Sequence, residues 1–395
     1  MEKTNSIKQL SSRKFISSAL EFYFERKFTV AIWRLPHSPV FHLTASENPR
    51  QSSDINLEEL KPGFLFSPFR PDKEKIYLPA DELYSFQSDQ VISAHGKHSD
   101  EIQSNQQHQP PHLQNGSPYY TIPNPYPPIT TEQDFHQLVV KCRDEIIRGN
   151  FEKIVPSRTK AIPLPEPLDL VDTFYRLCEL YPHAMVSVFS SPLTGTWVGA
   201  TPEILVSVTK DQRFHTVALA GTQPYKDGTE LRSVTWNQKD IEEQALVERY
   251  VISCFKKIRL REYNEQGPRT AIAGNVLHLK TDFDVDMVAT NFPQLGSIML
   301  KLLHPTSAVC GMPLEDSLQF LKDNEGYDRE FYSGYLGPVN IQNESHLYVN
   351  LRCMQLLPHE AILYAGAGVM GESDPEKEWQ ETEMKMSTLD RIIRK

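Results

Sequence analysis

The chain has 395 residues, of which 39% are hydrophobic and 23% are charged, and its 41 basic and 51 acidic residues give a net charge of −10. This acidic balance argues against a nucleic-acid partner or an anionic membrane surface, because both are bound through basic patches. The chain start lacks the apolar core of a signal peptide, and no apolar run reaches the roughly 18 residues of a membrane span. The five scattered cysteines predict reduced thiols rather than disulfides or a zinc site, so we expect a cytoplasmic globular protein.

Residues 1–85 are expected to be the N-terminal part of the fold. Apolar residues at helical spacing predict a helix over 15–23, and apolar runs at 29–33 and 64–66 predict strands. The segment 86–128 is rich in Gln, His, Ser, Asn and Pro and shows no apolar period, so we expect a mobile insertion there. Its histidines are interpreted as solvent-exposed residues rather than metal ligands: His98, His108 and His112.

Residues 129–395 mix strands and helices and are expected to form the catalytic part of the chain. The stretch 130–133 has the pattern of a capping box, so a helix should begin there and end at Gly149. Further strands are expected over 151–161, 185–190, 196–200, 204–208 and 214–219, and helices over 239–262, 314–324 and 375–394. Adjacent strands joined by short turns, with helices grouped between them, predict an α+β fold with large antiparallel sheets.

The last helix carries the first candidate site. Asp374 is a good N-cap and Pro375 suits the first helical position, which fixes the register. At about 100° per residue, Glu378, Glu381 and Lys385 fall on one flank beside the apolar stripe. An exposed Glu381–Lys385 pair is the simpler interpretation, and a cation site is the alternative.

The helix expected over 239–262 favours the cation site. Leu246, Val247 and Tyr250 share a face with Glu243, and a second apolar face lies opposite, so Glu243 should point into the interior. A buried carboxylate needs a partner, which is either an internal salt bridge or a cation. Two helices that both turn carboxylates inward would suit a hard cation such as Mg²⁺.

Two titratable residues lie in unusual places. Lys153 falls in a strongly apolar strand, where it is either an edge residue whose amine reaches solvent or a desolvated amine that acts as a base. Glu203 follows a Gly-Ala-Thr-Pro turn, as either a solvated turn residue or a general acid at the mouth of a site. A base, an acid and a metal together suit proton-coupled exchange on an anionic substrate.

Glycine-containing turns and one arginine are candidates for holding that substrate. Residues 220–222 and the stretch with Gly366 and Gly368 follow strands, where the backbone either approaches a ligand or simply turns tightly. Arg352, in an apparent strand of alternating character, would supply a bidentate clamp for a carboxylate.

These motifs, in this order, resemble those of the chorismate-utilising enzymes, which comprise isochorismate, salicylate, anthranilate and aminodeoxychorismate synthases. The matching stretches lie between residues 130 and 392 and read FEKIVPSR, WVGATPEILV, ALAGTQP, KDIEEQALV, NVLHLKTDF, LLHPTSAVCGMP, YDREFYSGYLGPV, VNLRCMQL and YAGAGVMGESDPEKEWQETEMKMSTL. The resemblance is not clear over residues 1–128. It implies an α+β sandwich of two large antiparallel β-sheets with helices outside and the active site between the sheets.

Within the family the chain looks most like isochorismate synthase, which implies that water attacks C2 of chorismate and the C4 hydroxyl leaves, with Mg²⁺ as cofactor at the ring carboxylate. The product would feed menaquinone or catechol siderophore synthesis. Lys153 matches the family lysine that activates the water, and Glu203 matches the acid that protonates the departing hydroxyl. The acidic positions around Mg²⁺ match Glu243, Glu378 and Glu381. The positions that hold or line the substrate match Ala220, Gly221, Thr222, His278, His304, Arg352, Gly366, Gly368 and Lys385.

Two alternatives to isochorismate synthase stay open. Lys153 disfavours anthranilate synthase, because the ammonia-using enzymes typically carry glutamine at that position. Salicylate synthase is the nearest alternative, because it forms isochorismate first and then expels pyruvate in the same pocket. A catalytically silent chorismate-binding protein is the other. The expected partner is chorismate, with no nucleic acid and no membrane, and the expected state is a monomer.

Overall fold

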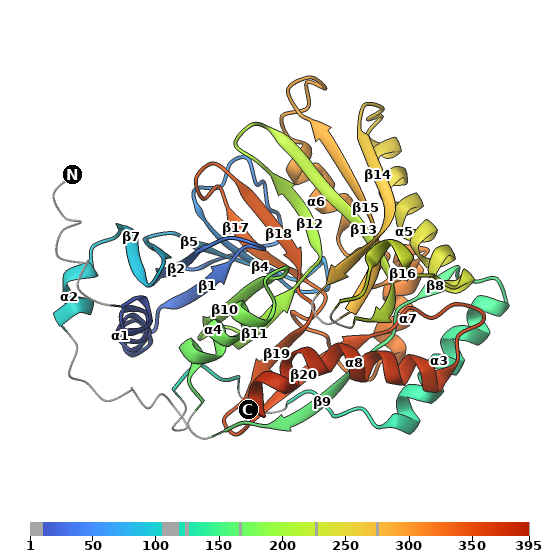
Figure 1. Ribbon diagram of the computed structural model, residues 1–395, viewed down its shortest axis with the longest axis horizontal. Helices are drawn as coiled ribbons and strands as arrows, with labels where there is room; N and C mark the ends of the chain where they lie inside the picture. The colour runs from blue at the N-terminus through green and yellow to red at the C-terminus, as the bar shows by residue number, and fades with distance from the viewer. Residues whose placement is uncertain are drawn as a thin grey trace.

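Two large antiparallel sheets, packed face to face, form the centre of the structure (Figure 1). The structure is a computed structural model that describes residues 11–104, 118–122, 126–165, 168–225, 228–273 and 276–394. Each sheet has nine strands within these residues. The predicted α+β sandwich is therefore confirmed.

The first sheet has the strand order β7-β6-β2-β1-β10-β11-β19-β20-β9. Its strands are β1 (Thr29–Arg34), β2 (Val40–Ser46), β6 (Glu82–Gln87), β7 (Gln90–His95), β9 (Ser157–Pro163), β10 (Met185–Ser191), β11 (Gly195–Thr201), β19 (Cys353–Leu356) and β20 (Glu360–Gly366). At its middle β1 pairs with β10, with Val30 opposite Ser190. Segments far apart in the sequence therefore share one sheet.

The second sheet has the order β14-β15-β13-β12-β18-β17-β4-β5-β3. Its strands are β3 (Arg50–Ser52), β4 (Gly63–Ser67), β5 (Lys75–Pro79), β12 (Ile204–Val208), β13 (Arg213–Pro224), β14 (Asn264–Ala273), β15 (Val276–Asp286), β17 (Tyr335–Val339) and β18 (Ser345–Val349). A short ladder joins β8 (Lys153–Ile154) to β16 (Gly311–Met312). The strand expected over 151–161 is divided into β8 and β9 at Pro156, which has no backbone N–H to donate to a ladder.

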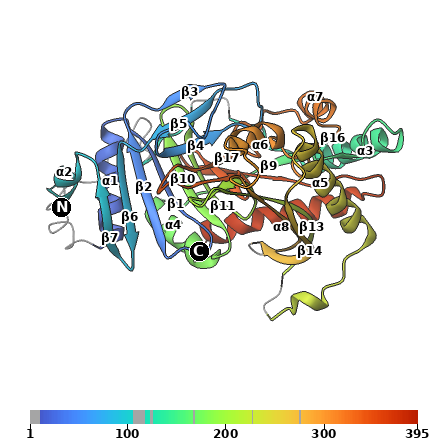
Figure 2. The ribbon, with the colours of Figure 1, turned by 90° about the horizontal axis from the view of Figure 1, so that it is seen from above.

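Helices cover the outer faces of both sheets, so the molecule has the layer order helix, sheet, sheet, helix (Figure 2). The helical elements are α1 (Ser12–Glu25), α2 (Ser99–Ser104), α3 (Glu132–Ile147), α4 (Leu170–Leu180), η2 (Leu231–Ser233), α5 (Gln238–Lys257), α6 (Leu295–Leu303), α7 (Leu314–Asn324) and α8 (Pro375–Ile393). In β1, Val30 and Ile32 pack in the cluster with α1, α4 and α8, whereas Ala31 and Trp33 pack between the sheets. This two-residue alternation buries both faces of the strand.

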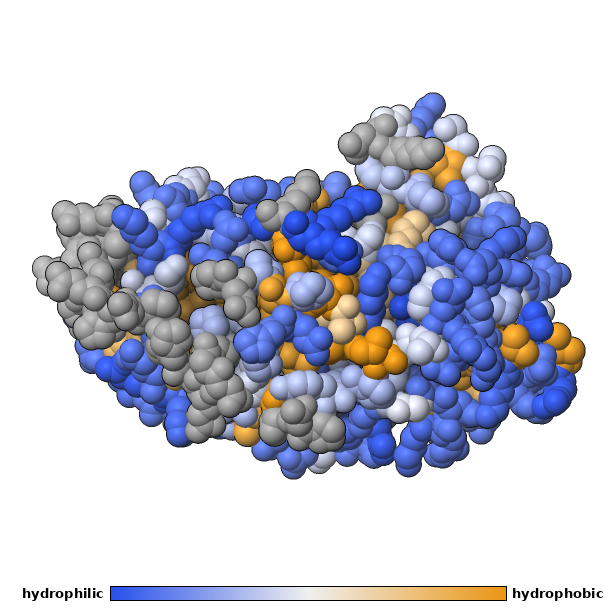
Figure 3. All heavy atoms as spheres, turned by 90° about the horizontal axis from the view of Figure 1, so that it is seen from below, coloured by the Kyte–Doolittle hydropathy of each residue, from blue (hydrophilic) through white to orange (hydrophobic). Residues whose placement is uncertain are grey.

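The face seen from below is mostly hydrophilic, with a few patches of apolar residues near its middle (Figure 3). Within the described part of the chain, no helix is both long and apolar enough to cross a membrane.

The prediction of a mobile insertion over 86–128 is wrong for the part of it that the structure describes. Strand β7 extends the first sheet and α2 follows it. Tyr119 and Tyr120 are 2% and 9% exposed and belong to the core beneath α1. The low apolar content of the segment therefore did not reveal that two of its tyrosines are buried in the core.

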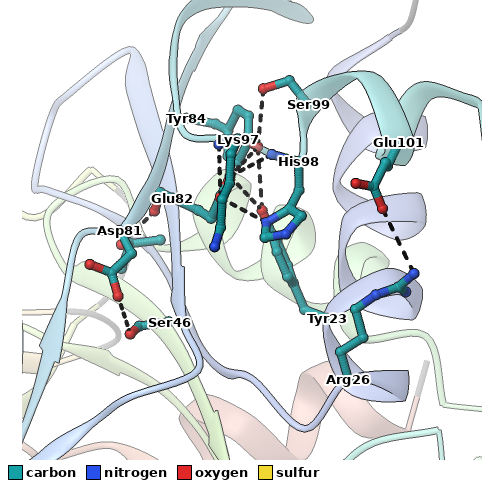
Figure 4. Close-up of polar contacts among 11 residues, drawn as sticks. Tyr23, Arg26, Ser46, Asp81, Glu82, Tyr84, Lys97, His98, Ser99 and Glu101 are labelled. Carbon is teal, nitrogen blue, oxygen red and sulfur yellow. Dashed lines mark hydrogen bonds and ion pairs between the residues drawn. The ribbon is translucent and has the colours of Figure 1, made fainter.

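The prediction that His98 is solvent-exposed is also wrong. Glu82, which is 1% exposed at the start of β6, accepts hydrogen bonds from the Tyr84 hydroxyl at 2.9 Å and the Lys97 backbone N–H at 3.0 Å. His98 Nδ1 lies 2.8 Å from the same carboxylate (Figure 4). This cluster holds the turn between β7 and α2 against the sheet. His108 and His112 lie outside the described residues.

Candidate active site

A small cavity of about 70 Å³ lies where strands from both sheets meet α5 and α8. Most of the predicted site residues line it: Glu203, Ala220, Gly221, Thr222, Glu243, Arg352, Gly366, Gly368 and Lys385. A larger hollow beside α7, lined by Phe69 and Leu318 among others, contains none of them. The smaller cavity is therefore the candidate active site.

Lys153 does not line this cavity itself but lies behind two residues that do, Glu243 and Gly368, and it is fully buried, with 0% of its surface exposed. Its Nζ is 2.7 Å from Glu243 Oε1. The interpretation as an edge residue that reaches solvent is therefore wrong. Gly368 makes room for the pair, because a Cβ at that position would clash with the Glu243 carboxylate and lie 3.1 Å from Lys153 Cε.

Glu203 sits in the turn between β11 and β12 and is 7% exposed, so it is not a solvated turn residue. Burial raises the pKa of Glu203 to about 7, even though Lys153, Lys385 and Arg352 act to lower it. A carboxyl with such a pKa carries a proton in a large share of molecules near neutral pH. That is the property a general acid needs.

The three acidic residues predicted to surround a metal each contact a lysine. Glu243 pairs with Lys153, Glu378 Oε1 lies 2.5 Å from Lys239 Nζ, and Glu381 lies 2.7 Å from Lys385 Nζ. The negative charges of all three carboxylates raise the pKa of Lys239, so all three lie near this lysine. They do not, however, come within 4.8 Å of one another as a set in the described residues.

Glu378 provides the test of whether a cation fits. It is 1% exposed, and its Oε2 has no hydrogen-bond partner of good geometry in the described part of the chain. Burial and then the nearby Glu381 raise the pKa of Glu378, while Lys239 and the Ser373 hydroxyl act in the opposite direction. A buried carboxylate oxygen without a partner is costly. It therefore fits a hard, oxygen-binding cation such as Mg²⁺.

Two cationic side chains form another wall of the cavity. The prediction that Arg352 lies within a strand is wrong. It lies between β18 and β19, where the chain crosses from one sheet to the other, and its φ is +47°. Burial lowers the pKa of Arg352 to about 10, which leaves the guanidinium charged at neutral pH. Lys385 Nζ donates to the Gly366 carbonyl at 2.9 Å. Both charges suit an anionic ligand.

The two predicted histidines do not line the cavity. Residues 220–222 do not follow a strand, as the sequence suggested, but lie within β13 at an irregularity of its ladder with β15. His278, on β15, contacts the Gly221 carbonyl there through Nδ1 at 2.5 Å. Burial, then Arg352, lowers the pKa of His278 to about 3, so its ring is neutral. His304 follows α6 and donates from Nε2 to the Pro68 carbonyl at 3.1 Å, which makes it a packing residue.

Sequence reasoning missed three residues of the site. Tyr332 and Tyr364 stack 5.3 Å apart and form an aromatic wall of the cavity. Lys239, the partner of Glu378, lies one helical turn before Glu243 on α5. That spacing was a usable signal for Lys239, whereas nothing local marked the two tyrosines.

Comparisons with known proteins agree with this geometry. The family model for chorismate binding enzyme matches residues 71–394. Isochorismate synthase DhbC from Bacillus subtilis is 29% identical over 299 residues, covering 72% of this chain and 73% of that protein. Isochorismate synthase EntC from Escherichia coli is 28% identical over 269 residues, covering 66% and 67%. The solved structure of MenF, the menaquinone-specific isochorismate synthase from Escherichia coli, has a TM-score of 0.72 at 18% identity and covers 98% of this chain and 92% of its own.

Proposed function

The chain belongs to the chorismate-binding enzymes, and we propose that it converts chorismate to isochorismate. The observation that carries the proposal is a pair of buried groups: the carboxyl of Glu203, which lines the cavity and whose pKa is raised to about 7, and the fully buried amine of Lys153, which contacts the lining residue Glu243. The two relatives named above, DhbC and EntC, are isochorismate synthases, and their matches cover 72% and 66% of this chain.

The reaction needs one base and one acid. The Lys153 amine takes a proton from a water molecule as the water oxygen bonds to C2 of the chorismate ring. The ring double bonds shift, the C4–oxygen bond breaks, and the departing hydroxyl takes the proton of Glu203 to leave as water. The atoms balance, because one water enters and one leaves. Each group then returns to its starting state by a net proton exchange with solvent.

The substrate carries two carboxylates, and the cavity offers groups for both. Arg352 and Lys385 supply positive charge on one wall, and the turn with Gly366 and Gly368 supplies backbone. The stacked rings of Tyr332 and Tyr364 give an apolar surface for the substrate ring. Burial excludes water other than the attacking molecule, which strengthens these charge interactions.

We also propose that Mg²⁺ is the cofactor, held by Glu378, Glu381 and Glu243. Support comes from the partnerless Oε2 of Glu378, from its contact with Lys239, and from the charges of Glu381 and Glu243, which act on the same lysine. When bound, the ion would supply positive charge that orients and stabilises the ring carboxylate.

We further propose that the enzyme works in the cytoplasm as a monomer. The location is supported by the five free thiols, because disulfides are rare in the reducing cytoplasm. Light scattering on the purified protein would test the monomer, and a dimer at assay concentration would contradict it.

Product analysis tests the activity. The purified protein is incubated with chorismate and Mg²⁺, and the products are separated by chromatography. Isochorismate alone supports the proposal. Salicylate together with pyruvate would instead show a salicylate synthase, and the absence of turnover would favour a chorismate-binding protein.

A further inference from the structure

The first turns of α3 and α8 lie side by side, away from the catalytic cavity, and bring three metal-ligating side chains together. Glu132 begins α3, His136 follows one turn later on the same face, and Glu376 lies in the first turn of α8. One ligand atom from each residue lies within 4.8 Å of the other two. Among the described residues, these are the three His, Cys, Asp or Glu side chains whose ligand atoms lie this close together.

His136 is the residue that points to a ligand. Its Nε2 atom is buried and has no hydrogen-bond partner among the residues that the structure describes. The atom faces Glu376 Oε2 at 3.6 Å, which is too far for a hydrogen bond. The ring packs edge-on against Trp379, with 6.3 Å between ring centroids and an interplanar angle of 84°, so its direction is set by packing.

Glu376 is oriented by a neighbour in the manner of a metal ligand. Gln380 Nε2 donates to Glu376 Oε1 at 2.7 Å, which leaves Oε2 directed at His136. Hydrogen bonds of this kind, from outside the ligand set, commonly fix the orientation of ligating carboxylates.

One imidazole nitrogen and two carboxylate oxygens suit zinc and neighbouring divalent transition metals, whereas Mg²⁺ prefers oxygen ligands alone. A tetrahedral zinc ion with bonds of roughly 2.0–2.1 Å places its ligand atoms about 3.3 Å apart. Glu132 is exposed and the Glu376 side chain is 55% exposed, so small rotations of both would close the present spacing. Their exposure also leaves a fourth position for water.

We propose that Glu132, His136 and Glu376 bind one divalent transition-metal ion of the zinc class, at a site distinct from the catalytic cavity. The ion ties the start of α3 to the start of α8. Because Glu378 lies two residues beyond Glu376, the tie also restrains the turn that carries a proposed Mg²⁺ ligand. The proposal does not depend on which reaction the cavity performs.

Metal titration of the full-length, tag-free protein tests the site. The protein is stripped with a chelator and titrated with Co²⁺, whose visible absorption reports a tetrahedral environment, and then with Zn²⁺ by calorimetry. The variants are His136→Gln and, because it lies at an exposed position and should not disturb folding, Glu376→Gln. His95→Gln is the matched control, since His95 is an exposed histidine on β7.

We expect one ion at this site, bound at least about 10–100-fold more weakly or not at all in His136→Gln and Glu376→Gln, because loss of even an outer hydrogen-bond partner of a metal ligand costs that much. Its affinity should be unchanged in His95→Gln. Titration of Glu378→Gln separates the two sites, because this variant should keep the ion. Wild-type affinity in both His136→Gln and Glu376→Gln would overturn the proposal. So would loss of the ion in Glu378→Gln alone, since the metal would then sit in the catalytic cavity.

Discussion

Replacing Glu203 by glutamine should abolish turnover and also make the folded protein more stable at alkaline pH. Burial raises the pKa of Glu203 from its ordinary value of 4.5 to about 7 in the folded protein. The folded state therefore holds this proton more tightly than the unfolded chain does. The contribution of protonated Glu203 to the free energy of unfolding is fully present below pH 4.5, and it is lost as the pH rises toward 7 and beyond.

The size of this effect follows from the two pKa values. The free energy of unfolding should fall by about 1 kcal/mol at pH 5 and by about 3 kcal/mol at pH 8, relative to strongly acidic conditions. The wild-type protein should therefore lose about 2 kcal/mol or slightly more between pH 5 and pH 8 on account of Glu203 alone. Glutamine does not ionise, so Glu203→Gln should not show this loss.

Urea unfolding of both proteins at pH 5 and pH 8 measures the difference. The exposed variant Glu59→Gln is the control, and it should follow the wild type at both pH values. Chorismate turnover, measured in parallel, should fall by about 10²–10⁴-fold in Glu203→Gln because the general acid is gone. If the free energies of unfolding of wild type and Glu203→Gln differ by the same amount at pH 5 and pH 8, the raised pKa of Glu203 is refuted. Retained turnover in Glu203→Gln would refute its role as the acid.

Three further outcomes are expected. Lys153→Ala should lower kcat by about 10²–10⁴-fold through loss of the base, and should cost about 3–5 kcal/mol in urea unfolding because Glu243 keeps an unpaired buried charge. The double variant Lys153→Met with Glu243→Gln should regain the stability without the activity. EDTA should stop turnover, and added Mg²⁺ should restore it, with an unchanged far-ultraviolet circular dichroism spectrum, because each proposed metal carboxylate has a lysine partner. Gly368→Ala should lower kcat through the clash with Glu243, whereas Gly371→Ala, whose new methyl group would have no neighbour closer than 3.9 Å, should not.

Elements with local end signals were predictable from the sequence. The last helix was expected over 375–394 and spans Pro375–Ile393, because Asp374 caps it by accepting the Lys377 backbone N–H. The helix expected from the capping-box pattern of 130–133 is present, but its N-cap is Thr131 rather than Thr130, and it accepts the Asp134 backbone N–H. Capping depends on neighbours in sequence, so the sequence reveals it.

Features that depend on distant contacts were not predictable in this way. The apolar content of 86–128 could not reveal that Glu82 holds His98, because order there depends on one buried carboxylate outside the segment. The position of Arg352 follows from a crossing between sheets, which looks like one continuous strand in the sequence.

The candidate site shows the same division. From the residues alone, Lys153 had two interpretations, and the structure excludes the edge residue that reaches solvent by showing the amine fully buried against Glu243. Lys239 went unnoticed because its partner Glu378 lies on another helix, 139 residues along the chain. The acidic residues and two of their lysine partners, Lys153 and Lys385, were therefore visible in the sequence, and only Lys239 was not.

The central position of β1 in the first sheet has a consequence for biosynthesis. Its neighbour β2 follows at once, but Val30 meets its other partner, Ser190, only 160 residues later. At about 5–20 residues per second, a ribosome needs roughly 10–30 seconds to make the intervening chain. During that time the nascent β1 has one unpaired, strongly apolar edge, which is a template for aggregation. Yield from a living cell should therefore depend on protection of this half-built sheet, by chaperones or by low temperature, more than on the stability of the finished enzyme.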